Sequence, residues 1–247
     1  MPRISSSVLG FPDFRGFTRA LILWNLVAYF VLLILGAFSR PLYDFAIVHL
    51  ALVPALVLHH GWIWQLGTYW IIHQGILATV FELLSIWFLA AFLESTHGSR
   101  WVAEIFFISV LGAGFAALLL ALALPGSELP VWGCYGGIFG LLIVFGVLYA
   151  DMEFMMFPLP FMIKAKYLVA VYMLIALAML FSAQRIFAFS QLGGALAAWL
   201  YIKFAPRRGF STASSESIYG LRNRYYRWKR RRAAKKFEVY MRKHRDN

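Results

Sequence analysis

Charged residues are scarce in this chain of 247 residues, where they make up 14% of the sequence against 62% hydrophobic residues. Soluble domains carry about 25% charged residues, so this composition excludes an ordinary soluble protein. Cysteine is almost absent. The single residue, Cys134, excludes an intramolecular disulfide and any cysteine-rich metal site. We also expect no cleavable signal peptide, because the first apolar run is too long and lacks a small-residue cleavage site.

Long apolar runs take the place of the missing charge. Runs of about 17 to 25 apolar residues can cross a bilayer as helices. The sequence predicts six of them, at residues 19–38, 69–93, 101–124, 132–150, 165–182 and 186–204. A further apolar stretch, 43–58, contains Asp44, His49 and Pro54 and is predicted to be an interfacial or re-entrant loop. We therefore expect an all-α integral membrane protein with six transmembrane helices packed as one bundle.

Basic residues are nearly missing from the first, third and fifth predicted loops, which contain only Arg40 and Arg185. The positive-inside rule then places both termini in the cytoplasm. The sequence divides into a short arm at 1–18, a membrane domain at 19–204 and a basic tail at 205–247. The net charge of +12 comes almost wholly from the tail.

Glycine is concentrated in the fourth predicted helix, in the segment "GCYGGIFG". Helices in a bilayer approach one another closely where their residues are small. The predicted packing residues of this helix are Gly133, Gly136, Gly137 and Gly140, and those of the sixth helix, in "SQLGGALAA", are Gly193, Gly194 and Ala198. We expect the fourth and sixth helices to be packing partners.

The segment at 222–236 is rich in Lys and Arg and has no acidic residue. Its candidate lipid- or partner-binding residues are Arg222, Arg224, Tyr225, Arg227, Trp228, Lys229, Arg230, Arg231, Arg232, Lys235 and Lys236. Basic groups near an anionic membrane surface contribute about 1 kcal/mol each, so adhesion to the inner leaflet is expected. A pure topology anchor, or binding to ribosomal RNA or another acidic partner, stays open because charge alone does not distinguish polyanions.

Four ordered motifs resemble the rhomboid family of intramembrane serine proteases. "WQLGTYWIIHQG" and "LSIWFLAAFLESTHGSRW" resemble the beginning and end of the second rhomboid helix, the latter with its Glu-x-x-x-Gly-Ser-Arg loop. "GCYGGIFG" resembles the Gly-x-Ser-Gly-x-x-x-Gly segment, and "SQLGGALAA" resembles the His-Leu-Gly-Gly segment. The resemblance covers residues 20–204, and the tail ending "KKFEVY" is similar to the tails of some bacterial members.

The catalytic positions of the family are changed. An active rhomboid has a Ser nucleophile and a His base, with a His and an Asn around the oxyanion; the matching positions here are Tyr135, Gln191, Ala78 and Glu82. A Gln amide cannot accept the nucleophile's proton, and an ionised Glu82 would repel the developing oxyanion. We therefore expect no enzymatic activity.

Glu82 needs a partner if it lies within the bilayer, and Tyr135, His73 and Gln191 are the candidates. An ionised Glu82 in a water-filled cavity is the alternative. Tyr135 is interpreted as a space-filling ring, with client binding as the alternative. Cys134 is interpreted as a packed apolar thiol on the side of the helix away from the site, rather than as a hydrolase nucleophile.

No cofactor or metal site is expected. His73 is interpreted as a structural residue, and His59 and His60 have no further ligands nearby in the sequence.

The resemblance implies a catalytically inactive rhomboid of bacterial type in the inner membrane, which binds transmembrane clients without cleaving them. A client would then enter laterally between the second and fifth helices. The alternatives are a structural subunit of a larger membrane complex and a residual intramembrane peptidase. The sequence does not identify the client, the host complex or the oligomeric state.

Overall fold

The computed structural model describes residues 13–124, 129–155 and 162–204. Contacts divide the chain into two units, 1–204 and 205–247, and all the described residues belong to the first. The predicted tail residues from Arg222 to Lys236, like most of the predicted arm at 1–18, lie outside the described residues.

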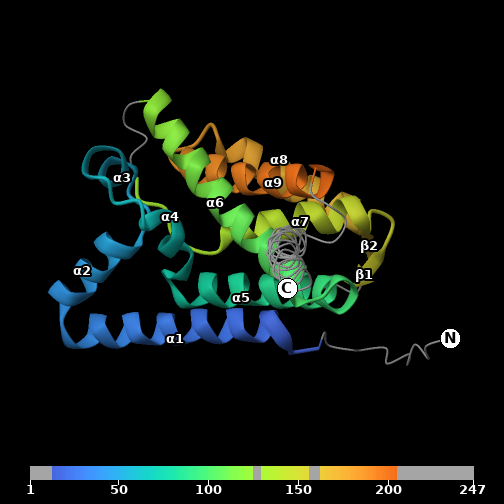
Figure 1. The fold of residues 1–247 in the computed structure, drawn as a ribbon, viewed down its shortest axis with the longest axis horizontal. Coiled ribbons are helices and arrows are strands. Elements are labelled where there is room, and N and C mark those ends of the chain that lie inside the picture. The colour runs from blue at the N-terminus through green and yellow to red at the C-terminus, as the bar shows by residue number, and fades with distance from the viewer. Residues whose placement is uncertain (1–12, 125–128, 156–161, 205–247) are drawn as a thin grey trace, which may run out of the picture. The chain divides into compact units, whose positions relative to one another are not determined.

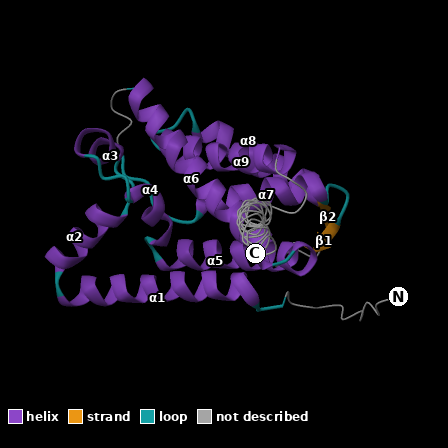
Figure 2. Cartoon of the chain, in the orientation of Figure 1, coloured by secondary structure: helices purple, strands orange, loops and turns teal. Residues whose placement is uncertain are grey.

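Helices dominate the first unit (Figures 1 and 2). The helices are α1 (Gly16–Phe38), α2 (Arg40–Leu50), α3 (Pro54–His60), α4 (Gln65–Thr68), a 3-10 turn η1 (Tyr69–Ile71), α5 (Ile76–His97), α6 (Ser99–Ala123), α7 (Tyr135–Leu148), α8 (Ala165–Met179) and α9 (Arg185–Phe204). Two short antiparallel strands, β1 (Glu153–Met155) and β2 (Met162–Lys164), connect α7 to α8. The sequence pattern predicted no strand there.

Four of the described helices, α1, α5, α6 and α9, are long and apolar enough to cross a membrane, and α7 and α8 are shorter apolar helices. The second span was predicted over 69–93, but its helix begins at Ile76 because residues 69–75 form η1 and an extended segment. The fourth was predicted over 132–150. Its helix, α7, has 14 residues and is therefore about 21 Å long, less than the ~30 Å hydrocarbon layer.

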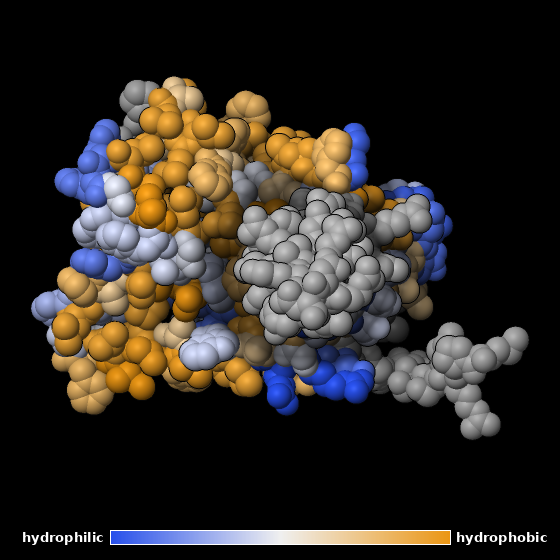
Figure 3. Space-filling model, in the orientation of Figure 1, coloured by the Kyte–Doolittle hydropathy of each residue, from blue (hydrophilic) through white to orange (hydrophobic). Residues whose placement is uncertain are grey.

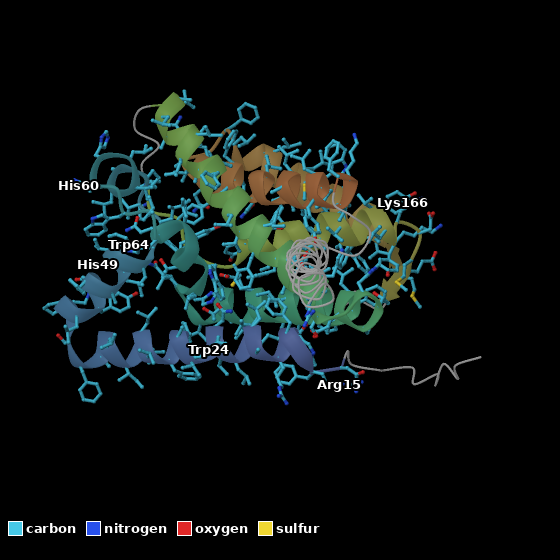
Figure 4. The ribbon with its side chains drawn as sticks, in the orientation of Figure 1. Arg15, Trp24, His49, His60, Trp64 and Lys166 are labelled. Carbon is cyan, nitrogen blue, oxygen red and sulfur yellow. The ribbon has the colours of Figure 1, made fainter. Side chains whose placement is uncertain are left out.

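The stretch 43–58, predicted to be a loop, forms most of α2 and the beginning of α3. Aromatic rings gather around it, since His49 packs on Phe45 and on Trp62. The Trp64 indole N–H donates to the His49 carbonyl at 3.0 Å, and Figure 4 shows these two residues close together. Such rings are typical of the membrane–water interface, the position expected for this stretch.

Helix α6 has buried residues along most of its length and packs against both α7 and α9. Small residues allow these helices to approach one another closely. A Cβ at Gly137 would lie 2.3 Å from Phe106 of α6, and one at Gly140 would overlap Ser109 of the same helix. A Cβ at Gly193 would lie 2.2 Å from Ala116, again on α6.

The predicted pairing of the fourth and sixth helices is therefore only part of the packing. Gly194 does meet α7, since a Cβ there would lie 2.4 Å from the Gly136 carbonyl oxygen, and Ala198 approaches Gly140. Most of the predicted packing glycines nevertheless contact α6. The spacing of small residues marks which helix faces are close-packed, but it does not say which helix covers each face.

Glu94 joins α5 to the start of α1. Its carboxylate accepts the N–H groups of Phe17 and Thr18 at 2.7 and 2.8 Å and also the hydroxyl of Ser99. The first N–H groups of a helix have no partner within that helix, so Glu94 caps α1 from its neighbour. This contact gives the Glu-x-x-x-Gly-Ser-Arg segment a structural role.

Apolar side chains cover much of the outer surface, as the orange residues in Figure 3 show. Trp24 on α1, Phe81 on α5 and Leu174 on α8 are 69%, 68% and 64% exposed. A soluble protein rarely exposes such large apolar areas. The surface therefore agrees with an integral membrane protein.

Candidate functional site

The segment before α7 carries the centre of the candidate site. Val131 exchanges two backbone hydrogen bonds with Leu52, of 2.9 and 2.7 Å, and the N–H of Gly133 donates to the Tyr69 carbonyl at 3.2 Å. Gly133 has φ +88°, a conformation that favours glycine. These contacts pair polar backbone groups of the irregular segment that precedes α7.

Glu82 on α5 points at this segment and is only 3% exposed. Its Oε2 accepts the backbone N–H of Cys134 at 2.9 Å. Cys134 is the residue just before the first turn of α7, where the helix dipole favours a negative charge. Tyr135, the first residue of α7, interacts with the same carboxylate.

His73 lies between Glu82 and α1. Its Nδ1 is 3.1 Å from Glu82 Oε2, and its Nε2 is 2.8 Å from Asn25 Oδ1. The Asn25 amide donates to the Leu21 carbonyl at 2.7 Å, which fixes its oxygen toward His73. Since that oxygen can only accept, His73 donates to it through Nε2, and Nδ1 faces the Glu82 carboxylate.

The Cys134 thiol completes this group, which we call the polar cluster: Asn25, His73, Glu82 and Cys134. Its Sγ donates to the Trp70 carbonyl at 3.1 Å and lies 3.4 Å from Asn25 Oδ1. The sequence analysis predicted a packed thiol directed away from the site: the thiol is fully buried, but the predicted direction was wrong. It treated Cys134 as helical, whereas the residue precedes α7 and follows a glycine with positive φ.

Of the four degenerate catalytic positions, the structure brings Tyr135 and Glu82 together. Gln191 on α9 is buried, but in the described part of the chain its side chain has no hydrogen bond to either residue. Ala78 is half-buried near the start of α5. Of the three partners expected for Glu82, His73 and Tyr135 interact with it, and no hydrogen bond from Gln191 to Glu82 is found in the described part of the chain.

Asn25 and Cys134 are the members of the polar cluster that sequence reasoning missed. The apolar run that begins at Ala20 contains one strongly polar residue, Asn25, before it ends at Ser39. Asn25 is fully buried. A buried amide in a span indicates an interhelical partner, so this signal was present in the sequence. The contact of Cys134 depends on the bend at Gly133 and had no sequence signal.

The contacts of the Cys134 thiol and of the histidines bear on nucleophilic chemistry and on metal binding. A nucleophile requires a nearby base, yet the Cys134 thiol bonds to a backbone carbonyl, and no hydrogen bond joins it to His73 among the residues described. His59 and His60, at the end of α3, are exposed. The one grouping of possible metal ligands found in the described ranges is His73, Glu82 and Cys134, which the sequence analysis did not bring together.

Comparison with known proteins identifies the family. The profile of a family described as "eukaryotic integral membrane protein (DUF1751)" matches residues 24–235. No curated protein matches the sequence significantly. The eukaryotic description gives no support to the bacterial type or to the bacterial inner membrane expected from the sequence. Because the match covers most of the chain, the protein belongs to this family of eukaryotic integral membrane proteins.

Proposed function

We propose that this protein is a rhomboid-like pseudoprotease, which binds transmembrane helices of other membrane proteins without cleaving them. In this proposal α7 and α8 complete a six-helix membrane bundle with α1, α5, α6 and α9, and both termini face the cytoplasm. The observation that carries the proposal is the hydrogen bond from the Cys134 N–H to the Glu82 carboxylate.

That hydrogen bond argues against peptide hydrolysis for a physical reason. A tetrahedral intermediate carries a negative oxygen, which needs free and correctly aimed donors. The N-terminus of α7 is suited to hold an anion, but Glu82 already occupies the Cys134 donor. A second anion beside this carboxylate would be repelled. Gln191, at the position of the base, cannot accept a proton from Tyr135.

Helix binding is supported by the exposed apolar faces of α5 and α8. Both helices contact α7. On α5 the residues Leu77 and Phe81 are 74% and 68% exposed and lie one turn apart. On α8 the matching exposed residue is Leu174. A client helix that enters laterally beside α7 would cover these side chains.

Site-specific photo-crosslinking tests this binding. A photoreactive amino acid is placed at Phe81 or Leu174, with Val27 on α1 as the matched control, since Val27 is also exposed and apolar. In eukaryotic cells we expect several crosslinked membrane proteins at Phe81 and Leu174 and few at Val27. A single partner in equal amount with the chain, crosslinked from all three positions, would overturn client binding and favour a subunit of a complex.

A cleavage assay tests the absence of activity. The purified protein is incubated with a transmembrane peptide, and no product is expected above that of a protein-free sample. Cleavage that disappears in Cys134→Ala or in Tyr135→Phe would refute the pseudoprotease proposal.

A further inference from the structure

Three side chains of the polar cluster are metal-ligating types, and they converge from three separate segments. A ring nitrogen of His73, a carboxylate oxygen of Glu82 and the sulfur of Cys134 all lie within 4.8 Å of one another, and all three residues are buried. His73 precedes α5, Glu82 lies in α5 and Cys134 precedes α7. The fold, and not a sequence motif, brings them together.

The spacing is close to that of a tetrahedral zinc site. With metal–ligand bonds of about 2.0–2.1 Å to nitrogen, 2.0–2.2 Å to oxygen and 2.3 Å to sulfur, tetrahedral angles place the ligand atoms about 3.3–3.6 Å apart. The distance from His73 Nδ1 to Glu82 Oε2 is 3.1 Å, and the sulfur lies within 4.8 Å of both. A shift of about an ångström by the Cys134 side chain would bring its sulfur to the distance from the other two ligand atoms that a tetrahedral zinc ion requires.

Asn25 prepares His73 for this role. A metal-binding His usually donates its other ring N–H to an oxygen, which fixes the tautomer. Here Nε2 donates to Asn25 Oδ1 at 2.8 Å, and the Asn25 orientation is fixed in turn by the Leu21 carbonyl. Nδ1 is thus the nitrogen directed toward Glu82 and available to a metal.

The charge balance also fits a divalent ion. A divalent ion bound by a neutral imidazole, a carboxylate and a thiolate forms a site with zero net charge. An uncompensated charge in the membrane interior is costly, and this set of ligands leaves none.

We propose that His73, Glu82 and Cys134 form a binding site for a divalent transition-metal ion, with zinc as the best match. Imidazole and thiolate ligands favour zinc over magnesium and calcium, which prefer oxygen ligands. Three protein ligands leave one position of a tetrahedral ion for a water. The site does not depend on the proposed client binding.

The test uses the full chain, purified in detergent without a histidine tag and stripped with a chelator. Cobalt serves as the probe because it gives a thiolate-to-metal absorption band. Cys134 is the only cysteine of the chain, so any such band must come from this residue. We expect one cobalt per chain, displacement by one equivalent of zinc and no band in Cys134→Ser.

Two further variants separate a ligand site from adventitious binding. Asn25→Leu is expected to weaken zinc binding by about 10- to 100-fold, the usual effect of losing a residue that orients a ligand. His97→Gln is the matched control, because His97 lies at the exposed end of α5 and should leave the affinity unchanged. Elution volume and helical content establish that each variant is folded.

Two outcomes of the cobalt and zinc measurements would contradict the proposed site. Absence of the thiolate band in folded wild-type protein would overturn it, and so would zinc that remains bound at the same stoichiometry and affinity in folded Cys134→Ser.

Discussion

Replacing Glu82 tests the polar cluster by stability measurements, with chelator present so that no metal contributes. One oxygen, Oε2, accepts from Cys134 N–H at 2.9 Å and lies 3.1 Å from His73 Nδ1. Glu82→Ala removes both contacts at a buried position. Leaving a buried polar group unpaired costs about 1–3 kcal/mol, so two such groups give about 2–6 kcal/mol.

The membrane lowers this figure. Hydrogen bonds between helices in a bilayer average about 0.6 kcal/mol, with values up to about 1.7, because the unfolded chain also finds partners there. Two contacts at the upper end give about 3 kcal/mol. We therefore expect Glu82→Ala to lower the free energy of unfolding by about 2–4 kcal/mol, measured by titration with a denaturing detergent in mixed micelles.

Glu82→Gln is the sharper variant because it keeps the size of the side chain. If the amide oxygen faces Cys134 N–H, it can pair with His73 only through an Nδ1 proton. A neutral His73 with its proton on Nδ1 has none on Nε2, so Nε2 can no longer donate a hydrogen bond to the Asn25 oxygen. If the amide nitrogen faces Cys134 instead, two N–H donors point at each other and the hydrogen bond from the Cys134 N–H is lost. Either orientation leaves one contact unmade, at about 1–2 kcal/mol.

A variant of an exposed carboxylate serves as the control for Glu82→Gln. Glu153→Gln affects a carboxylate that is 54% exposed and 3.9 Å from Lys164, so its effect should stay below about 0.5 kcal/mol. If Glu82→Gln is as stable as the wild type, the arrangement around Oε2 is wrong. A double-mutant cycle with His73→Gln should show coupling between the two residues, and purely additive effects would contradict the pairing.

Three further variants test the framework by the same titration. Glu94→Ala removes the cap of α1 and should cost about 1–2 kcal/mol, with faster hydrogen exchange at Phe17 and Thr18; unchanged exchange would argue against the cap. Gly194→Ala places a Cβ 2.4 Å from the Gly136 carbonyl and should cost about 1–3 kcal/mol, whereas Gly67→Ala, with nothing within 4 Å, should be neutral; equal effects would refute the close packing. Tyr69→Phe removes a hydroxyl that donates to the Val110 carbonyl at 2.6 Å and should cost about 1 kcal/mol; no loss would mean that this bond is not formed.

The apolar runs predicted the helices well, because length and hydropathy alone decide whether a segment can cross a bilayer. They did not predict where α5 and α7 begin. Ile72 and Val131 are as apolar as the helices that follow them, yet both lie in extended backbone that neighbouring segments pair or bury. Apolar composition does not separate a buried extended segment from a helix.

The candidate site was only partly predictable from sequence. Glu82 was identified because a carboxylate within an apolar run requires a partner, and two of the three partners expected for it are beside it. Asn25 contacts His73 from 48 positions away, and Cys134 reaches the cluster through the turn at Gly133. Such contacts follow from the path of the chain: the buried amide of Asn25 indicates a partner in another segment but not which one, and "GCYGGIFG" does not show that Cys134 reaches the cluster.

The start of α7 links the stability of the fold to the proposed loss of catalysis. The first N–H groups of a helix have no partner within that helix, and here Glu82 accepts the N–H of Cys134 at that end. A hydrolase would need the same donors to stay free for a developing oxyanion. On the pseudoprotease proposal, the residue that stabilises the start of α7 is therefore also the residue that would block the chemistry. A variant that frees this donor must lose stability, so on this proposal activity cannot be restored at Glu82 without weakening the fold.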